Sequence, residues 1–464
     1  MKKIPLSLIV LAATSALYAQ TPTNEELLKR IEVLEKQAQH KNESTQSTRW
    51  DHLKIGGDFR FSVDTLDYKM ASGTNVKNDA LLTNRLWLTL GYTADEHISF
   101  HSKLAFNKVF GQPNFTNQPQ YDQFDWFGAT TNTDNQLRVK EAYIDYQDET
   151  LFGADIPWDF GVGRRPTSYN KLISMRDDEA ASSPLGHIVS AEFDGGHFGL
   201  DLSKVTGISG AHIKFAMGRG MSSIQPAVSA TPDADLGNNI NMFDMNIIPY
   251  ADKDLHVEMQ ILKATNLVDI TNSGFNPNTG SYTAANYDAT LKTVGDIYLT
   301  SAMALYNIED LGNTKVFASF AASKTDPRNG QYMLGSPDNK IGTSIWVGTQ
   351  IPSFLTDGGH WGLEFNHGSK YFRPFTYAED TVVGSKIAAR GNAYEAYFTE
   401  VLAKGLTFQA RFTYIDYDYT GSNGFFGAQT GTPVKIADIP ANTDLANATV
   451  DKATDIRFYL RYRF

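Results

Sequence analysis

The sequence predicts an all-β protein, a transmembrane antiparallel β-barrel of about 16 strands. Three observations carry this prediction. The chain has a continuous apolar run only at its extreme N-terminus, so a bundle of membrane-spanning helices, which needs about 20 apolar residues per span, is excluded. From Leu53 onward apolar residues recur at every second position. The connections between the periodic segments alternate between short and long.

The first segment is typical of a secretory signal peptide. Lys2 and Lys3 form a basic start, and an apolar stretch runs from Ile4 to Leu17. Small residues then offer a cleavage site after Ala19. We therefore expect residues 1–19 to be removed on export.

Residues 20–49 are expected to form a short helix and a linker. Leu27, Ile31, Leu34 and Ala38 are spaced so that they share one face of a helix. The segment covers only two heptads, which is marginal for an autonomous coiled coil. Two interpretations stay open, a periplasmic oligomerisation stalk and a solvated spacer helix.

Residues 50–464 are expected to form the barrel. Sixteen candidate strands alternate in period two, as strands that separate lipid from a polar lumen do. They cover residues 53–65, 81–93, 97–107, 136–147, 158–165, 188–204, 211–219, 240–250, 254–264, 293–307, 314–324, 340–351, 360–371, 392–402, 406–419 and 453–464.

The last strand has the clearest pattern and ends on Phe464. Its apolar face holds Ile456, Phe458, Leu460, Tyr462 and Phe464, and its other face holds Arg457, Tyr459, Arg461 and Arg463. If the first strand runs outward, every short turn lies on the periplasmic side, together with both termini. Unpaired edge strands are not tolerated in hydrocarbon, so the sheet is expected to close.

Composition narrows the function classes. The 22 Tyr and 28 Phe suit aromatic girdles at two membrane interfaces. The absence of Cys excludes disulfides and thiolate metal sites, and no motif predicts a metal or cofactor. A formal net charge of −11 argues against nucleic acid as a partner.

The lumen is expected to carry a charged constriction. The third external loop, from Pro166 to His187, contains Arg176, Asp177, Asp178 and Glu179. Strand parity gives a basic wall of Arg60, Arg85, Arg165, Arg411, Arg457, Arg461 and Arg463. The same parity turns Glu364, Asn366 and Lys370 toward the lumen. We expect the acids to fold inward and face the arginines, giving a transverse field; the alternative is a solvated external loop.

The chain resembles general bacterial outer-membrane porins in strand number, loop parity and terminal Phe. The stretches GVGRRPTSYNK and GLEFNHGSKYFRPF, with the N-terminal heptads, also resemble a porin-like outer-membrane family known only as a domain of unknown function. The porin resemblance implies a third loop that narrows the pore and a terminal strand that the barrel assembly machinery reads at Phe464. It also suggests a homotrimer.

These features favour a porin in the bacterial outer membrane, surrounded by lipid and lipopolysaccharide, that lets small hydrophilic solutes or ions diffuse passively. We expect no enzymatic activity. Two alternatives stay open. His367 and Ser369 share a lipid-facing side of one strand, as in outer-membrane phospholipases, although no third residue to orient the imidazole is evident from sequence. The barrel could also be a non-conducting structural or adhesive protein.

Overall fold

A computed structural model describes residues 52–110, 137–165, 171–179, 181, 185–190, 193–221, 239–272, 275–276, 281–282, 287–376, 381–422 and 432–464. The chain divides into two units, Met1–Leu53 and Lys54–Phe464. The expected signal peptide, N-terminal helix and linker lie outside the described residues. Among the residues that are described, no helix is both long enough and apolar enough to cross a membrane.

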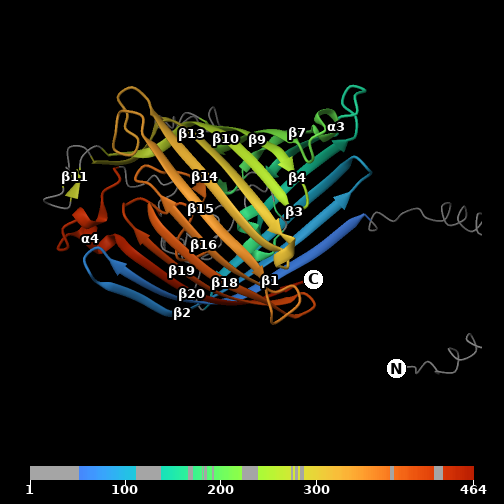
Figure 1. Cartoon of the computed structure of the whole chain (residues 1–464). Helices are drawn as coiled ribbons and strands as arrows, with labels where there is room; N and C mark the ends of the chain where they lie inside the picture. Colours follow the sequence, from blue (N-terminus) through green and yellow to red (C-terminus); the bar gives the residue numbers. More distant parts are fainter. Residues whose placement is uncertain are drawn as a thin grey trace, which may run out of the picture. The chain divides into compact units, whose positions relative to one another are not determined.

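The second unit is one closed antiparallel barrel, which confirms the predicted fold class and strand number (Figure 1). In barrel order its strands are β1 (Leu53–Met70), β2 (Asn75–Thr93), β3 (Ile98–Val109), β4 (Arg138–Asp148), β5 (Trp158–Arg165), β7 (Phe193–Asp201), β8 (His212–Met221), β9 (Ile240–Ala251), β10 (Leu255–Asn272), β13 (Tyr287–Ile308), β14 (Thr314–Pro327), β15 (Ile341–Pro352), β16 (His360–Gly368), β18 (Gly391–Ala403), β19 (Leu406–Tyr417) and β20 (Val450–Arg463).

Smaller elements lie in the connections. They are α2 (Lys171–Asp177), β6 (Val189–Ser190), α3 (Ser203–Thr206), β11 (Phe275–Asn276), β12 (Ser281–Tyr282), η2 (Glu309–Leu311), β17 (Phe375–Thr376), η4 (Ile436–Asp438) and α4 (Asp444–Ala448). Of these, β6 pairs in parallel with β17, and β11 pairs with β12. The connection between β5 and β7 thus touches the connection between β16 and β18, far away in sequence.

Closure occurs where β20 pairs with β1, with Phe59 opposite Tyr462 and Asp64 opposite Arg457. Along β20 the side chains alternate as the sequence predicts. Phe458 and Leu460 are 46% and 43% exposed on the outer face, whereas Arg457 and Arg461 are 0% and 1% exposed. Large exposed apolar side chains recur on the other strands, so the barrel presents an apolar outer surface.

Several strand boundaries differ from the sequence-based ones. The sixth barrel strand was expected over 188–204, but β7 begins at Phe193, and residues 189–190 form β6 instead. The first two strands were expected to be joined by a long connection, but they extend to Met70 and from Asn75. Leu66 and Tyr68 continue the inward alternation by packing on an apolar cluster, which explains the extension of β1.

Candidate functional site: the barrel lumen

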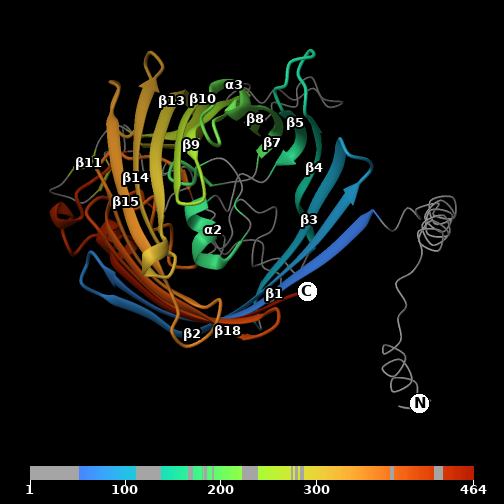
Figure 2. The same ribbon diagram turned by 45° about the vertical axis from the view of Figure 1, so that its right-hand side comes forward.

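The third long connection enters the barrel, and α2 lies inside the ring of strands (Figure 2). Leu172 and Ile173 are nearly fully buried and belong to an apolar cluster with wall residues such as Trp346. Their burial anchors the helix by its apolar side, because removing such side chains from water is favourable by about 1.5–3 kcal/mol each. The polar end of α2 then reaches the strands of the closing seam, β18 to β2.

At this end the predicted acids meet the predicted arginines. Arg176 Nη1 lies 3.1 Å from Glu395 Oε1 on β18, and Arg411 Nη1 lies 4.0 Å from Asp177 Oδ1. Arg461 forms an ion pair with Glu179. Asp177 is buried, which alone would raise the pKa of its carboxyl, but the charges of Arg176 and Arg411 outweigh burial and lower that pKa to about 2.

Asp178 takes a different position from Asp177. It adopts a φ of 51°, and its side chain is 39% exposed. Its Oδ1 lies 3.7 Å from His360 Nδ1, and its carbonyl oxygen accepts a hydrogen bond of 2.6 Å from Arg463 Nη1. The backbone is thus held at the seam while the carboxylate keeps contact with water.

The seam is a network of mixed charge, not the basic wall that we expected. Asp58 accepts hydrogen bonds from Arg461 Nε at 3.0 Å and from Arg85 Nη2 at 3.4 Å. Asp64 pairs with Arg457. Arg60 lies 5.4 Å from the ring centroid of Tyr459. The expected field across a water gap is therefore replaced here by contact pairs, because acids on β1, β18 and β20 alternate with the arginines.

Arg165 was expected in the same wall but lies on β5, away from the seam. Its Nη1 is 2.6 Å from Asp145 Oδ1, and its guanidinium lies 4.0 Å from the ring centroid of Tyr143. Gly161 makes room for this pair. A Cβ at Gly161 would lie 2.2 Å from Asp145 Oδ1 and 2.9 Å from Arg165 Nη1.

Of the other three residues that were expected to face the lumen, two do and one does not. Glu364 and Asn366 are buried inside the barrel, where Glu364 accepts hydrogen bonds from Trp346 Nε1 at 2.8 Å and Lys386 Nζ at 2.7 Å. Lys370 instead lies beyond the end of β16, with its Nζ 5.1 Å from the ring centroid of Tyr371. The strand ends at Gly368, three residues earlier than expected, so the assumed parity does not reach Lys370.

A second inward segment, made of residues 369–376 and 381–390, was missed by the sequence analysis. Lys386 bridges Glu364 and Glu395, and β17 pairs with β6 of the third connection. Phe372 and Phe375 are fully buried in an apolar cluster with Ile188 and Val189 and with wall residues of β9 to β14. The apolar run Ile387, Ala388 and Ala389 in a long connection was the available signal.

His187 is buried in the same packed region. Its Nδ1 lies 2.7 Å from Ser319 Oγ and its Nε2 lies 2.9 Å from Ser344 Oγ. The imidazole sits between Trp346 and Phe372, at centroid distances of 5.8 and 6.0 Å. Burial lowers the pKa of His187 to about 3, so the side chain is neutral at physiological pH.

The lumen face of β3 to β8 is less filled. Side chains of Asp145, Asp159 and His212 are 29%, 34% and 23% exposed, whereas those of Arg457 and Arg461 at the seam are 0% and 1% exposed. His197 and Asp159 form an ion-pair contact, with His212 nearby. No group of three or more acidic or His side chains suited to a metal ion occurs among the described residues.

On the outer face, Asn392 of β18 supplies a residue that the sequence analysis did not find. Its Oδ1 lies 3.0 Å from His367 Nδ1, as the register of β16 and β18 requires. Ser369 Oγ, however, accepts a hydrogen bond of 2.8 Å from the backbone N–H of Thr343. Within the described part of the chain, no hydrogen bond joins Ser369 to His367. The side chains of Ser369, His367 and Asn392 therefore do not form the hydrogen-bonded series of a catalytic triad.

Comparison with known proteins gives a family and a set of similar folds. A family model described as "Protein of unknown function (DUF3373)" matches residues 75–464. No curated protein matches the sequence. Among solved structures, the trimer form of the outer membrane protein OmpT of Vibrio cholerae has a TM-score of 0.46 at 12% identity, covering 89% of this chain and 99% of that one.

Two further barrels are similar to the same degree. OmpF of Salmonella typhi, in complex with daunomycin, has a TM-score of 0.45 at 8% identity and covers 89% of this chain and 97% of that one. OprB of Pseudomonas putida has a TM-score of 0.47 at 12% identity and covers 91% and 97%.

Proposed function

We propose that this chain, which belongs to the DUF3373 family, is an outer-membrane porin that lets small hydrophilic solutes or ions diffuse passively. The observation that carries the proposal is the contrast between the two faces of β3 to β8. Their outer face is apolar, with Phe160 and Phe215 exposed, and their lumen face holds partly exposed charged side chains such as Asp159. A barrel of sixteen strands is wide enough for an aqueous channel.

The proposed path runs along one half of the lumen. α2, β6 and residues 369–376 and 381–390 pack against the other half, where the lumen side chains are almost completely buried. Conductance is therefore expected to be smaller than that of an unobstructed barrel with the same number of strands. Solutes would pass beside His101, Tyr143, Asp159 and His212.

Orientation and partners follow from the same proposal. The short connections 94–97, 252–254 and 404–405 share one rim with the closing contact between Gly57 and Phe464. The equally short connection 71–74 lies at the opposite rim, so the expectation that every short turn shares one side was wrong there. We assign this rim to the periplasm, as in barrels with short periplasmic turns. The apolar outer face would contact lipid and lipopolysaccharide, Phe464 would contact the assembly machinery, and a homotrimer is the proposed assembly.

A lipid hydrolase is the second candidate, and the contact between His367 and Asn392 favours it. A serine nucleophile needs its hydroxyl within hydrogen-bond reach of the base. Ser369 Oγ instead accepts a hydrogen bond from the backbone N–H of Thr343, which a backbone carbonyl would accept if the strand continued. We therefore propose that the protein is not an enzyme. Release of fatty acid from phospholipid vesicles by the purified protein, lost in Ser369→Ala, would reverse this assignment.

The porin proposal is tested with single cysteines, since the chain contains none. His212→Cys places a thiol on the lumen face of β8, and Ile213→Cys is the matched control on the neighbouring, outward position. In planar bilayers the unmodified protein should give stable conductance steps without an energy source. A bulky, water-soluble thiol reagent should reduce the steps of His212→Cys alone.

Two results would contradict the proposal. A correctly folded protein that gives no conductance steps is a structural or adhesive barrel, not a porin. Equal reduction of conductance in both cysteine variants, or in neither, would show that ions do not pass beside β8.

A further inference from the structure

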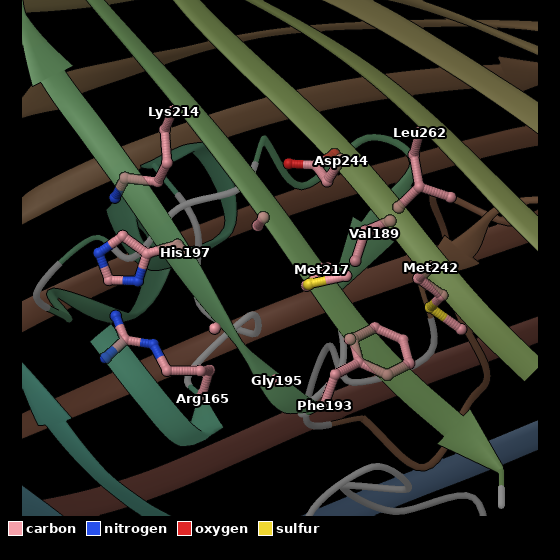
Figure 3. Close-up of a pocket in the computed structure, with 13 residues that line it drawn as sticks. Arg165, Val189, Phe193, Gly195, His197, Lys214, Met217, Met242, Asp244 and Leu262 are labelled. Carbon is pink, nitrogen blue, oxygen red and sulfur yellow. The ribbon is translucent and has the colours of Figure 1, made fainter. Parts of the chain in front are cut away.

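A small cavity opens between the barrel wall and β6, at the border between the half of the lumen that we propose conducts and the packed half (Figure 3). Its volume is about 70 Å³, several times the 10–15 Å³ that one buried water needs on the same scale. The wall part comes from β5, β7, β8, β9 and β10, and Val189 of β6 supplies the inner side. It is separate from the ion-pair network of the closing seam.

The lining of the cavity is divided by chemistry. Arg165, His197 and Lys214 lie on one side in Figure 3, and Met242, Leu262 and Val189 lie on the other. Met242, Leu262 and Val189 are almost fully buried. A basic side next to a compact apolar side matches a ligand with one negative group and a short apolar body.

The basic side chains are held in position by acidic side chains that do not line the cavity. Arg165 contacts Asp145, and His197 contacts Asp159, so two carboxylates lie behind the basic side. A guanidinium has five donors, so Arg165 can serve Asp145 and a ligand together. The acid that does line the cavity, Asp244, accepts a hydrogen bond of 2.6 Å from Gln260 Nε2.

Glycines create the space. A Cβ at Gly195 would lie 2.1 Å from the carbonyl oxygen of Met217 on the neighbouring strand, so only glycine lets β7 approach β8 here. Gly196 and Gly218 also line the cavity, and none of the three contributes a side chain to fill it. The wall is therefore hollow where the basic and apolar sides meet.

We infer that this cavity is a binding site for small organic carboxylates with a short apolar body, which would make the pore selective for such anions. The carboxylate is bound by Arg165 and Lys214, and the apolar body lies against Met242, Leu262 and Val189. The inference rests on the proposed function in one respect, since the ligand has to reach the cavity from a water-filled lumen.

The test is an equilibrium binding measurement on the folded protein in a non-ionic detergent, so that it does not depend on conductance. Saturation-transfer NMR is recorded with butyrate, and with n-butylammonium and acetate as matched probes; inorganic phosphate, which has no non-exchanging protons to observe, is tested as a competitor of butyrate. Butyrate should bind most tightly. Acetate and phosphate lack the apolar body, and n-butylammonium carries the wrong charge.

Variants assign the binding to this cavity. Arg165→Gln should weaken butyrate binding about tenfold, the loss expected for one charge-assisted hydrogen bond. Met242→Gln keeps the side-chain length and should lower the affinity for butyrate toward the affinity for acetate. Arg164→Gln is the control, because Arg164 is the neighbouring residue and does not line the cavity. If Arg165→Gln does not fold, judged by heat-modifiable electrophoretic mobility, Lys214→Gln replaces it.

Each outcome decides between the two proposals. If n-butylammonium or acetate binds as well as butyrate, or if Arg165→Gln and Arg164→Gln bind alike, the carboxylate site is wrong, even when the protein conducts. If butyrate binding passes these tests and no conductance is seen in bilayers, the site stands and the porin proposal fails.

Discussion

At the scale of single residues, the two adjacent acids of the third connection have different surroundings. Asp177 is enclosed by Arg176 and Arg411, whereas Asp178 keeps 39% of its side chain exposed. A charge that is paired in contact contributes little to the electric field at a passing ion. An exposed charge still acts on ions within the Debye length of about 8 Å. The two acids should therefore differ in their influence on permeation.

We expect Asp178→Asn to shift ion selectivity toward anions. Asp177→Asn should shift it less but should destabilise the docked helix, because breaking a buried ion pair costs on the order of 3–5 kcal/mol. Reversal potentials in a salt gradient measure the first effect, and thermal unfolding measures the second. Asp310→Asn, at an exposed position on a short connection, is the control. Equal reversal potentials for Asp178→Asn and the control would place Asp178 outside the ion path.

Sequence parity predicted which arginines face the lumen, but it did not predict what they contact. Arg457 and Arg461 are inward because neighbours on the strand alternate faces, a local property. Asp58, Asp64 and Asp455 follow the same parity and are buried between the arginines, so the mixed charge of the seam was predictable from the strand pattern although we expected a basic wall. The contact of Arg461 with Glu179 depends on how a loop folds, which periodicity does not encode.

At the scale of elements, the lumen is occupied by two connections that hold each other. β6 and β17 have two residues each and pair across about 185 positions of sequence. Strands of this length carry no periodic signal, and their pairing is non-local, so sequence patterns cannot reveal it. The third connection was expected to enter the barrel, whereas residues 372–391 were expected to be an ordinary connection between two strands.

The docked third connection should be sensitive to acid through His187. The pKa of this side chain is about 3 when buried, against 6.5 ordinarily, so the docked connection binds fewer protons than a released one. Its docking is therefore fully stable above about pH 6.5 and weakens as pH falls toward 3, by up to about 1.4 kcal/mol per pH unit. We expect conductance to rise between pH 7 and pH 4.5 as the connection is released.

His187→Asn is the comparison, because an amide can still bond to Ser319 and Ser344 but does not titrate in this range. Bilayer conductance measured at steps of pH should become flatter in this variant. A pH profile identical to that of the unmodified protein would mean that other groups, such as the seam acids, control the response.

At the scale of the whole molecule, the alternation of apolar and polar residues and of short and long connections was sufficient to predict the number of strands. Both patterns arise from the solvent on each side of the sheet, so they are visible in sequence. The ends of strands were less well predicted, as β1, β2, β10 and β13 extend beyond their expected bounds. The extension of β1 keeps the inward alternation through Leu66 and Tyr68, which pack on an apolar cluster that the pattern of one strand does not reveal.

Closure of the barrel brings the last residue onto the first strand. Gly57 and Phe464 exchange two backbone hydrogen bonds of 3.0 Å, and the Phe464 ring lies over Gly57 on the outer face. A Cβ at Gly57 would lie 2.2 Å from the Phe464 ring, so the ring would have to turn away from a larger residue at this position. The terminal aromatic thus has a structural role in closure in addition to the proposed role in assembly.

We expect Gly57→Val to displace the Phe464 ring and to lower the stability of the folded barrel by up to about 1 kcal/mol, because the ring is 67% exposed and can turn away from the new side chain. Gly91→Val is the matched control, because a Cβ at Gly91 would meet only Lys54, at 3.9 Å. The temperature at which the compact form is lost in heat-modifiable electrophoresis should fall for Gly57→Val and stay nearly unchanged for Gly91→Val. Adding Phe464→Ala to Gly57→Val should remove part of the difference, since the smaller side chain relieves the clash. If the two glycine variants lose the compact form at the same temperature, the contact between Phe464 and Gly57 does not contribute to closure.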